Sequence, residues 1–133
     1  MLSRAELMAI ARARVKDAKA LLKTRRYDGA FYLCGYALEC VLKARIVATL
    51  CWQGFPETGG EFKDLQSFKT HDLDLLLKLS GRETKIRSNS AHVFQWSGVA
   101  QWDPEVRYKR VGSASRTDVL QIIQSVESLF QVL

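Results

Sequence analysis

The sequence predicts an all-α fold, an antiparallel up-and-down bundle of four to five helices. Apolar residues recur at helical spacing in several segments, one long segment is apolar almost all round, and no segment shows the alternation typical of strands. The chain has 133 residues, of which 47% are hydrophobic and 26% are charged. This length and composition predict a single globular domain over residues 1–133.

The first predicted helix spans residues 3–26. Ser3 and Glu6 form a capping-box pattern at its start, and an apolar stripe follows. A basic stripe lies about 100° around the helix from the apolar one. Its members are Arg12, Lys16, Lys19, Lys23 and Arg26. The net charge of +6 belongs wholly to residues 1–26, and the stripe has two open interpretations: a strip that contacts nucleic-acid phosphates, or a solvated helix face.

Residues 27–50 predict the central helix, because a helix that is apolar almost all round is a buried one. One polar stripe interrupts it, and its members fall within about 60° of one another around the helix. They are Tyr32, Tyr36, Glu39 and Lys43. Buried polar groups must be paired or must line a cavity, so a structural Glu39–Lys43 pair and a pocket wall both remain open. Gly35 predicts the close approach of another helix or of a partner chain.

The second half of the chain has a weaker helical pattern. Residues 52–69 lack a helical period and contain several Gly, which predicts a long and partly packed loop. Thr70 is the predicted N-cap of a short helix that follows this loop. Residues 82–101 predict a fourth helix, and the last helix is expected to begin at Ser113 or Ser115.

Several classes of protein are disfavoured by the sequence. Charged residues interrupt the best apolar run, so it is too short for a membrane span, and the first residues lack the uncharged core of a signal peptide. Three cysteines without a C-x-x-C pair disfavour a disulfide framework or a zinc site. No P-loop or dinucleotide-binding motif is present. We therefore expect a cytoplasmic protein with no metal and no cofactor.

Three motifs, taken together, resemble HEPN-domain proteins, which are small helical bundles named for a nucleotide-binding role. The motifs are Tyr32-Leu-Cys-Gly-Tyr-Ala-Leu-Glu-Cys-Val-Leu-Lys43, Lys69-Thr-His-Asp-Leu73 and Trp102-Asp-Pro-Glu-Val-Arg-Tyr108. The resemblance spans most of the chain. It implies a homodimer that acts beside a minimal nucleotidyltransferase, as in a toxin–antitoxin pair.

These motifs predict a site that binds a nucleotide or RNA. A Tyr ring can stack on a base, and Lys and Arg can contact phosphate. The candidate ligand-binding residues are Tyr32, Tyr36, Glu39, Lys43, His71, Arg107 and Tyr108. His71 has a second interpretation as a residue that only bonds the nearby backbone.

A catalytic alternative rests on Arg87 and His92. Catalytically active HEPN proteins resemble metal-independent ribonucleases with an R-x(4–6)-H motif, in which His transfers a proton and Arg stabilises the phosphate. Arg87-Ser-Asn-Ser-Ala-His92 is a literal match. Residues at this spacing point about 140° apart on a regular helix, so both reach one phosphate only at a helix end, a kink or a dimer interface. The remaining alternative is a protein-interaction module without a ligand.

Overall fold

The computed structural model describes all residues 1–133 and consists of helices joined by turns and loops. The α-helices are α1 (Arg4–Lys23), α2 (Tyr27–Thr49), α3 (Leu73–Leu79), α4 (Glu83–Arg87), α5 (Ser90–Ser97) and α6 (Arg116–Phe130). Two short 3-10 helices, η1 (Gln66–Phe68) and η2 (Pro104–Tyr108), lie in the connections. The predicted all-α class is confirmed. The chain forms more helices than the four to five expected.

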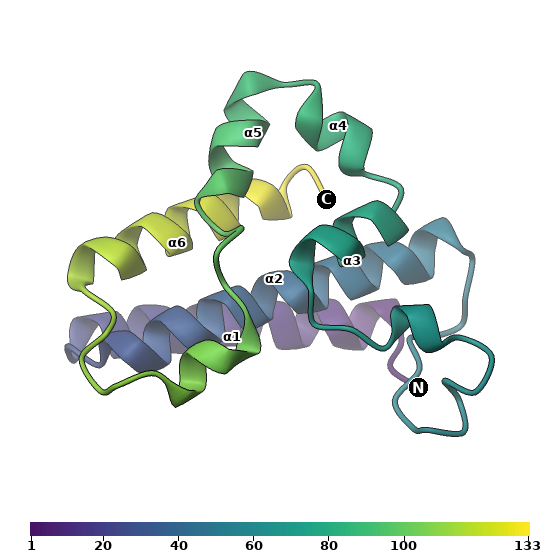
Figure 1. The fold of residues 1–133 in the computed structure, drawn as a ribbon, viewed down its shortest axis with the longest axis horizontal. Helices are drawn as coiled ribbons and strands as arrows, with labels where there is room; N and C mark the ends of the chain where they lie inside the picture. Colours follow the sequence, from purple (N-terminus) through teal and green to yellow (C-terminus); the bar gives the residue numbers. More distant parts are fainter.

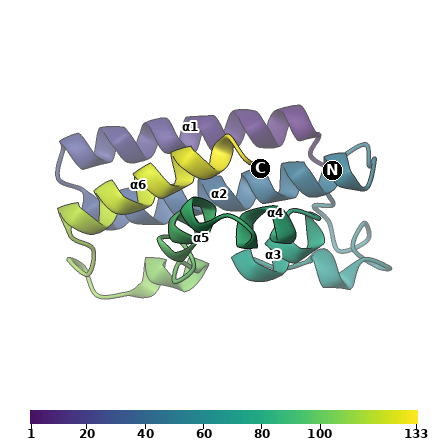
Figure 2. The same ribbon diagram turned by 90° about the horizontal axis from the view of Figure 1, so that it is seen from above.

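Helices α1 and α2 form a long hairpin, and α6 packs against α2 (Figure 1). Figure 2 shows that α6 runs in the same direction as α2 and opposite to α1. Helices α4 and α5 project from this group as a short arm. The antiparallel up-and-down topology is therefore not confirmed, because two of the three longest helices run in parallel.

The start of α1 is fixed by the predicted capping box. The Ser3 hydroxyl accepts a hydrogen bond from the Glu6 backbone N–H at 3.2 Å, and the Glu6 carboxylate accepts one from the Ser3 N–H at 2.8 Å. The apolar stripe of α1 is buried against α2. The basic stripe is exposed along its length, as both of its interpretations require, and Lys19 pairs with Glu127 of α6 at 2.9 Å.

Helix α2 lies at the centre of the molecule, as its apolar sequence predicts. Ten of its 23 residues belong to one cluster of 29 buried hydrophobic residues. Gly35 approaches Trp102 so closely that an added Cβ would lie 2.2 Å from the indole ring. The expected close approach is therefore real, but its cause is a side chain of this chain instead of another helix or a partner chain.

The loop between α2 and α3 is held by aromatic packing and by one backbone pair. The Trp52 and Phe68 rings are 4.9 Å apart, and the Phe55 and Phe62 rings are 6.0 Å apart. Leu2 and Phe55 exchange two backbone hydrogen bonds of 2.9 and 2.6 Å. The prediction of a long, partly packed loop is confirmed, and it closes over one end of the α1–α2 hairpin (Figure 1).

Two predicted helix boundaries are wrong, and a capping side chain explains each correction. Asp72, not Thr70, is the N-cap of α3, because its carboxylate accepts from the Leu75 N–H at 3.1 Å. The predicted helix over 82–101 is broken into α4 and α5. Asn89 is the N-cap of α5. Its side-chain oxygen accepts hydrogen bonds from the backbone N–H groups of Ala91 and His92, so a new helix begins here and α4 does not continue.

The last helix begins at Ser115, one of its two predicted starts. The Ser115 hydroxyl accepts from the Asp118 N–H at 3.1 Å, and the Asp118 carboxylate accepts from the Ser115 N–H at 2.8 Å. The apolar face of α6 then packs on α2. No helix of the structure has both the length and the apolar character needed to cross a membrane.

Candidate functional site

The polar stripe of α2 centres on the carboxylate of Glu39, which is only 1% exposed. Its Oε1 atom accepts a hydrogen bond from Lys43 Nζ at 2.6 Å and lies 2.9 Å from His71 Nδ1. Its Oε2 atom is buried and has no hydrogen-bond partner. A buried carboxylate is tolerated when it is paired, and here one oxygen carries both contacts. The predicted Glu39–Lys43 pair therefore forms, and His71 joins it from outside α2.

The contact with Glu39 orients the imidazole of His71. An ionised carboxylate can only accept hydrogen bonds, so His71 Nδ1 must carry the hydrogen. In the neutral ring this leaves Nε2 as the acceptor. The His71 side chain is 65% exposed, so Nε2 is open to a ligand. The bond to Glu39 thus differs from the expected bond to nearby backbone, and it produces a carboxylate-oriented histidine.

A cavity of about 380 Å³ lies between the α1–α2 hairpin and the loop before α3. We call it the α2–loop cavity. Its walls carry the aromatic rings of Tyr36, Phe55, Phe62 and Phe68, together with apolar side chains from the start of α1. Its basic side chains are Lys43 and Lys69, its histidine is His71, and its acidic residue is Glu57. An apolar cavity with a few convergent polar groups is the usual form of a small-molecule site.

Two side chains of α2 in this cavity, the Tyr36 phenol and the Cys40 thiol, stay neutral near pH 7. Burial raises the pKa of the Tyr36 phenol to about 12 and the pKa of the Cys40 thiol to about 11. Tyr36 therefore offers a hydroxyl that can donate or accept a hydrogen bond. Cys40 is a poor nucleophile here, because the thiolate is the reactive form. The arrangement favours binding through Tyr36 and the cations over thiol chemistry.

A second cavity, of about 490 Å³, lies on the other side of His71. We call it the acidic cavity, because its walls include Asp72, Asp74, Asp103 and Glu105, with Arg107 as its one Lys or Arg. Carboxylates in this number disfavour a phosphate by charge repulsion. His71 lines both spaces, and the two lysines lie on the side of the α2–loop cavity.

The remaining predicted ligand residues form a line of aromatic rings that continues along α2. The Tyr32 ring is stacked 6.5 Å from Tyr36 and 6.1 Å from Trp102. The Arg107 guanidinium reaches the Tyr32 hydroxyl at 3.5 Å and lies 4.9 Å from the Tyr108 ring. Arg107 and Tyr108 thus lie beside Tyr32, but none of these three residues lines the α2–loop cavity.

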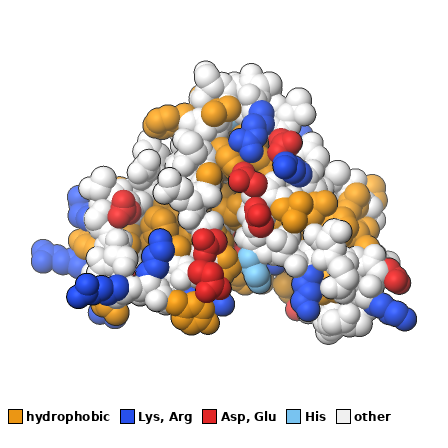
Figure 3. All heavy atoms as spheres, in the orientation of Figure 1, with side chains coloured by type: hydrophobic (Ala, Val, Ile, Leu, Met, Phe, Trp, Pro, Cys, Tyr) orange, Lys and Arg blue, Asp and Glu red, His pale blue; other side chains and the backbone are white.

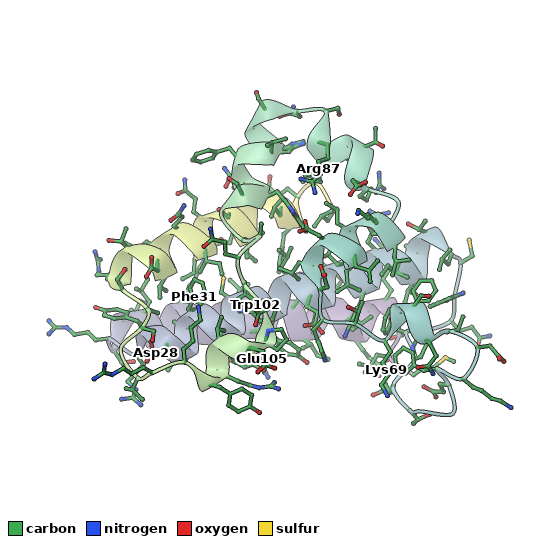
Figure 4. All side chains as sticks on the ribbon, viewed as in Figure 1. Asp28, Phe31, Lys69, Arg87, Trp102 and Glu105 are labelled. Atoms are coloured by element: carbon green, nitrogen blue, oxygen red, sulfur yellow. The ribbon has the colours of Figure 1, made fainter.

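Arg87 and His92 lie on the projecting arm and point to different neighbours. Arg87 is the last residue of α4 and contacts the Asp74 carboxylate at 3.4 Å. His92 lies in α5, where its Nδ1 is 3.4 Å from the Lys85 carbonyl oxygen, and it lines a groove between α5 and α6. Figure 4 shows Arg87 beside α4, away from the labelled residues of the bundle. No hydrogen bond joins Arg87 to His92. Of these two residues, only His92 lines the groove between α5 and α6.

Sequence reasoning did not single out Lys69 and Trp102 as site residues, although both lie inside the motifs. Lys69 precedes His71 by two positions and lines the same cavity. Trp102 is 3% exposed and covers Gly35 and Tyr32. Gly35 on α2 indicated a close neighbour, but the sequence alone did not identify that neighbour as Trp102.

No group of three or more His, Cys, Asp or Glu side chains is placed to hold a metal ion. Contacts join Tyr36, Tyr32, Arg107 and Tyr108 in one group and Lys43, Glu39 and His71 in another. Of these residues, only Tyr36, Lys43 and His71 line the α2–loop cavity. Arg87 and His92 form no hydrogen bond with these residues or with each other. Comparisons with protein-family models, with curated proteins and with solved structures found no match.

Proposed function

We propose that this chain is a nucleotide- or RNA-binding helical module, and that the α2–loop cavity is its binding site. The observation that carries the proposal is one cavity with aromatic walls and two convergent lysines, Lys43 and Lys69, beside His71. Tyr36 or a Phe ring gives a base an apolar face to stack on. The cations give a phosphate charge-assisted hydrogen bonds.

The size and charge of the cavity support a small anionic ligand. Its volume of about 380 Å³ falls within the roughly 300–1,000 Å³ typical of ligand pockets. Lys43 already contacts Glu39, so Lys69 is the group freer to contact phosphate. The acidic cavity beyond His71 would accept the uncharged edge of a ribose or a base, and it would repel a second phosphate.

The finer parts of the proposal rest on the resemblance to HEPN-domain proteins. They are a HEPN-like bundle, a cytoplasmic location, a homodimer, and a minimal nucleotidyltransferase as partner in a toxin–antitoxin-type system. Helices α1, α2 and α6 supply the long helices of such a bundle. Each of the other two motifs contacts the α2 motif, His71 at Glu39 and Arg107 at Tyr32, which supports a shared role for the three motifs.

The direct test compares Lys69→Met with Lys63→Met by calorimetric titration of AMP and UMP. Both side chains are exposed and lie in the same loop, but only Lys69 lines the cavity. We expect Lys69→Met to weaken binding about tenfold, the loss of roughly 1.4 kcal/mol that a charge-assisted bond provides. Lys63→Met should bind like the original protein. Equal affinity for both variants would reject the cavity as the site.

A second candidate function, metal-independent RNA cleavage, is favoured by one observation. The Glu39 carboxylate orients His71 at 2.9 Å, and the exposed Nε2 is then free to accept a proton from a ribose 2′-hydroxyl. The original alternative, with Arg87 and His92, lacks a shared cavity. Cleavage in the presence of EDTA that His71→Ala abolishes and His92→Ala retains would establish this function at His71. Cleavage that His92→Ala abolishes and His71→Ala retains would assign the activity to Arg87 and His92.

Absence of cleavage and of binding to nucleotides or RNA would leave the third possibility, an interaction module without a ligand. In that case the stripe of α2 would be a structural pair that satisfies its own charges.

A further inference from the structure

One end of the molecule gathers basic side chains from two segments that are far apart in the sequence. The α1–α2 turn supplies Lys23, Arg25 and Arg26, and the segment from η2 to α6 supplies Lys109, Arg110 and Arg116. We call these residues the basic end surface. All of them are exposed, and none forms an ion pair with a carboxylate. Figure 3 shows Lys and Arg side chains at this end, on the left of the view.

Asp28 holds the two basic segments together. Its carboxylate accepts hydrogen bonds from the backbone N–H groups of Gly112 at 2.7 Å and Ala114 at 2.9 Å. These bonds lower the pKa of the Asp28 carboxyl, and nearby Arg26 lowers it further. The bonds fix the loop before α6 beside the first turn of α2, two residues after Arg26.

The carboxylates at this end are used by the backbone, which leaves the cations without partners. Asp28 binds the two N–H groups of the loop, and Asp118 binds the Ser115 N–H in the capping box of α6. A cluster of cations that stays unpaired costs stability through mutual repulsion. Such a cluster is suited to an external polyanion, whose binding releases counterions.

An exposed aromatic ring lies in the same segment. Tyr108 is 72% exposed, and the Arg107 guanidinium lies 4.9 Å from its ring. Val111, which directly precedes Gly112, is 93% exposed. Large exposed rings next to cations are the usual feature of single-strand recognition, where bases stack and phosphates pair with Lys and Arg.

We infer that the basic end surface binds a single strand of RNA, with Tyr108 as a stacking platform for a base. The inference deepens the proposed function, on which it rests only for the choice of RNA. The surface is separate from the α2–loop cavity, because Asp28 and Lys69 lie at opposite ends of the molecule (Figure 4). Loss of binding at one site can therefore be distinguished from loss at the other.

The test combines Arg25→Gln, Arg26→Gln, Lys109→Gln and Arg110→Gln in one protein. The control combines Lys63→Gln, Lys78→Gln and Lys85→Gln, which are exposed lysines outside this surface. Binding of a fluorescent twelve-nucleotide poly(U) RNA is measured by anisotropy at several salt concentrations, and AMP binding is measured in parallel. Circular dichroism checks that each protein is folded.

We expect the four-residue variant to bind RNA at least tenfold more weakly, with AMP affinity unchanged. The slope of log K against log salt should fall by up to about 3, since each phosphate contact with a single strand contributes about 0.7. The control variant should retain the affinity and the slope of the original protein. Equal loss in both variants, or unchanged RNA binding, would overturn the inference.

Tyr108 distinguishes a base from other polyanions. We expect Tyr108→Phe to keep RNA affinity and Tyr108→Leu to lose roughly 5- to 100-fold, because stacking needs a ring. Equal affinity of the two variants would overturn the stacking role. Binding of vesicles with 30% anionic phospholipid but not of RNA would assign the surface to a membrane and would also overturn the inference. Failure of the protein to bind AMP, with RNA binding as expected, would reject the α2–loop cavity as a nucleotide site and would still support RNA binding at the basic end surface.

Discussion

The cluster of Glu39, Lys43 and His71 and the pair of Arg87 and His92 offered the same types of chemistry in the sequence, but they have different surroundings in the fold. Glu39 is buried in a long helix, and its partners lie 2.6 and 2.9 Å away. Arg87 and His92 lie on two short helices and contact other groups at 3.4 Å. The comparison shows that spacing predicts contact when both residues share one regular helix.

Where the helix breaks, the spacing of two residues no longer predicts that their side chains meet. Asn89 ends the regularity between Arg87 and His92, and the break does not turn the two side chains toward one cavity. Burial reinforces the difference, because a buried charge must find partners and an exposed charge has no such requirement. Measurements of the stability of variants test this contrast.

Lys43→Met should have the largest effect. The Glu39 carboxylate would keep only His71 as a partner, and a buried charge without compensation costs about 3 kcal/mol or more. Chemical denaturation of the variant measures the loss. The double variant with Glu39→Gln should recover much of the stability, because no charge is then left buried. A loss below about 1 kcal/mol for Lys43→Met would show that the cluster is open to water.

Gly35→Ala should have the next largest effect. The added Cβ would lie 2.2 Å from the Trp102 ring, and overpacking of a core costs about 1–3 kcal/mol. Gly59→Ala is the matched control, since nothing lies within 4 Å of a Cβ there. The change at Gly35 should also alter the Trp102 fluorescence, because it displaces the ring that covers Tyr32. An unchanged melting temperature and spectrum would contradict the packing described for this side of α2.

Asp28→Asn should have an intermediate effect, because Asp28 is half-buried. Its folded-state pKa is lowered by the N–H groups of Gly112 and Ala114, so its stabilisation is fully present above the unfolded pKa, about pH 4, and is lost as the pH falls through the folded-state pKa. We expect a loss of about 1 kcal/mol at pH 7, after allowance for solvent screening. The difference between the two proteins should disappear at low pH. A difference that persists at pH 2 would show that the ionised carboxylate is not the cause.

The double variant Arg87→Ala and His92→Ala should have the smallest effect. The contacts of both residues are exposed and long, so the free energy of unfolding should change by no more than about 0.5 kcal/mol. Titration with AMP should give the same affinity as the original protein. A large loss of affinity would show that these residues meet at a ligand after all, and the contrast with the Glu39 cluster would fail.

The features that the sequence predicted are those that depend on residues within one helix. The capping box of Ser3 and Glu6, the burial of α2 and the contact of Glu39 with Lys43 follow from spacing along one helix. The break at Asn89 was missed, because a side-chain cap competes with helix continuation and leaves only a weak signal in the pattern. The contacts of Trp102 with Gly35 and of Asp28 with the later loop join residues far apart in the chain, and spacing carries no information about them.

The bond from Gly112 N–H to Asp28 spans 84 positions, so its formation closes a very long stretch of chain. Contacts of this separation carry a high entropic cost and form after local helices during folding. The bond also lies at the exposed edge of the molecule, where opening needs less than global unfolding. The amide hydrogens of Gly112 and Ala114 should therefore exchange with solvent deuterium sooner than those in the middle of α2. Their exchange rates would report how often the two basic segments separate while the helical core stays intact.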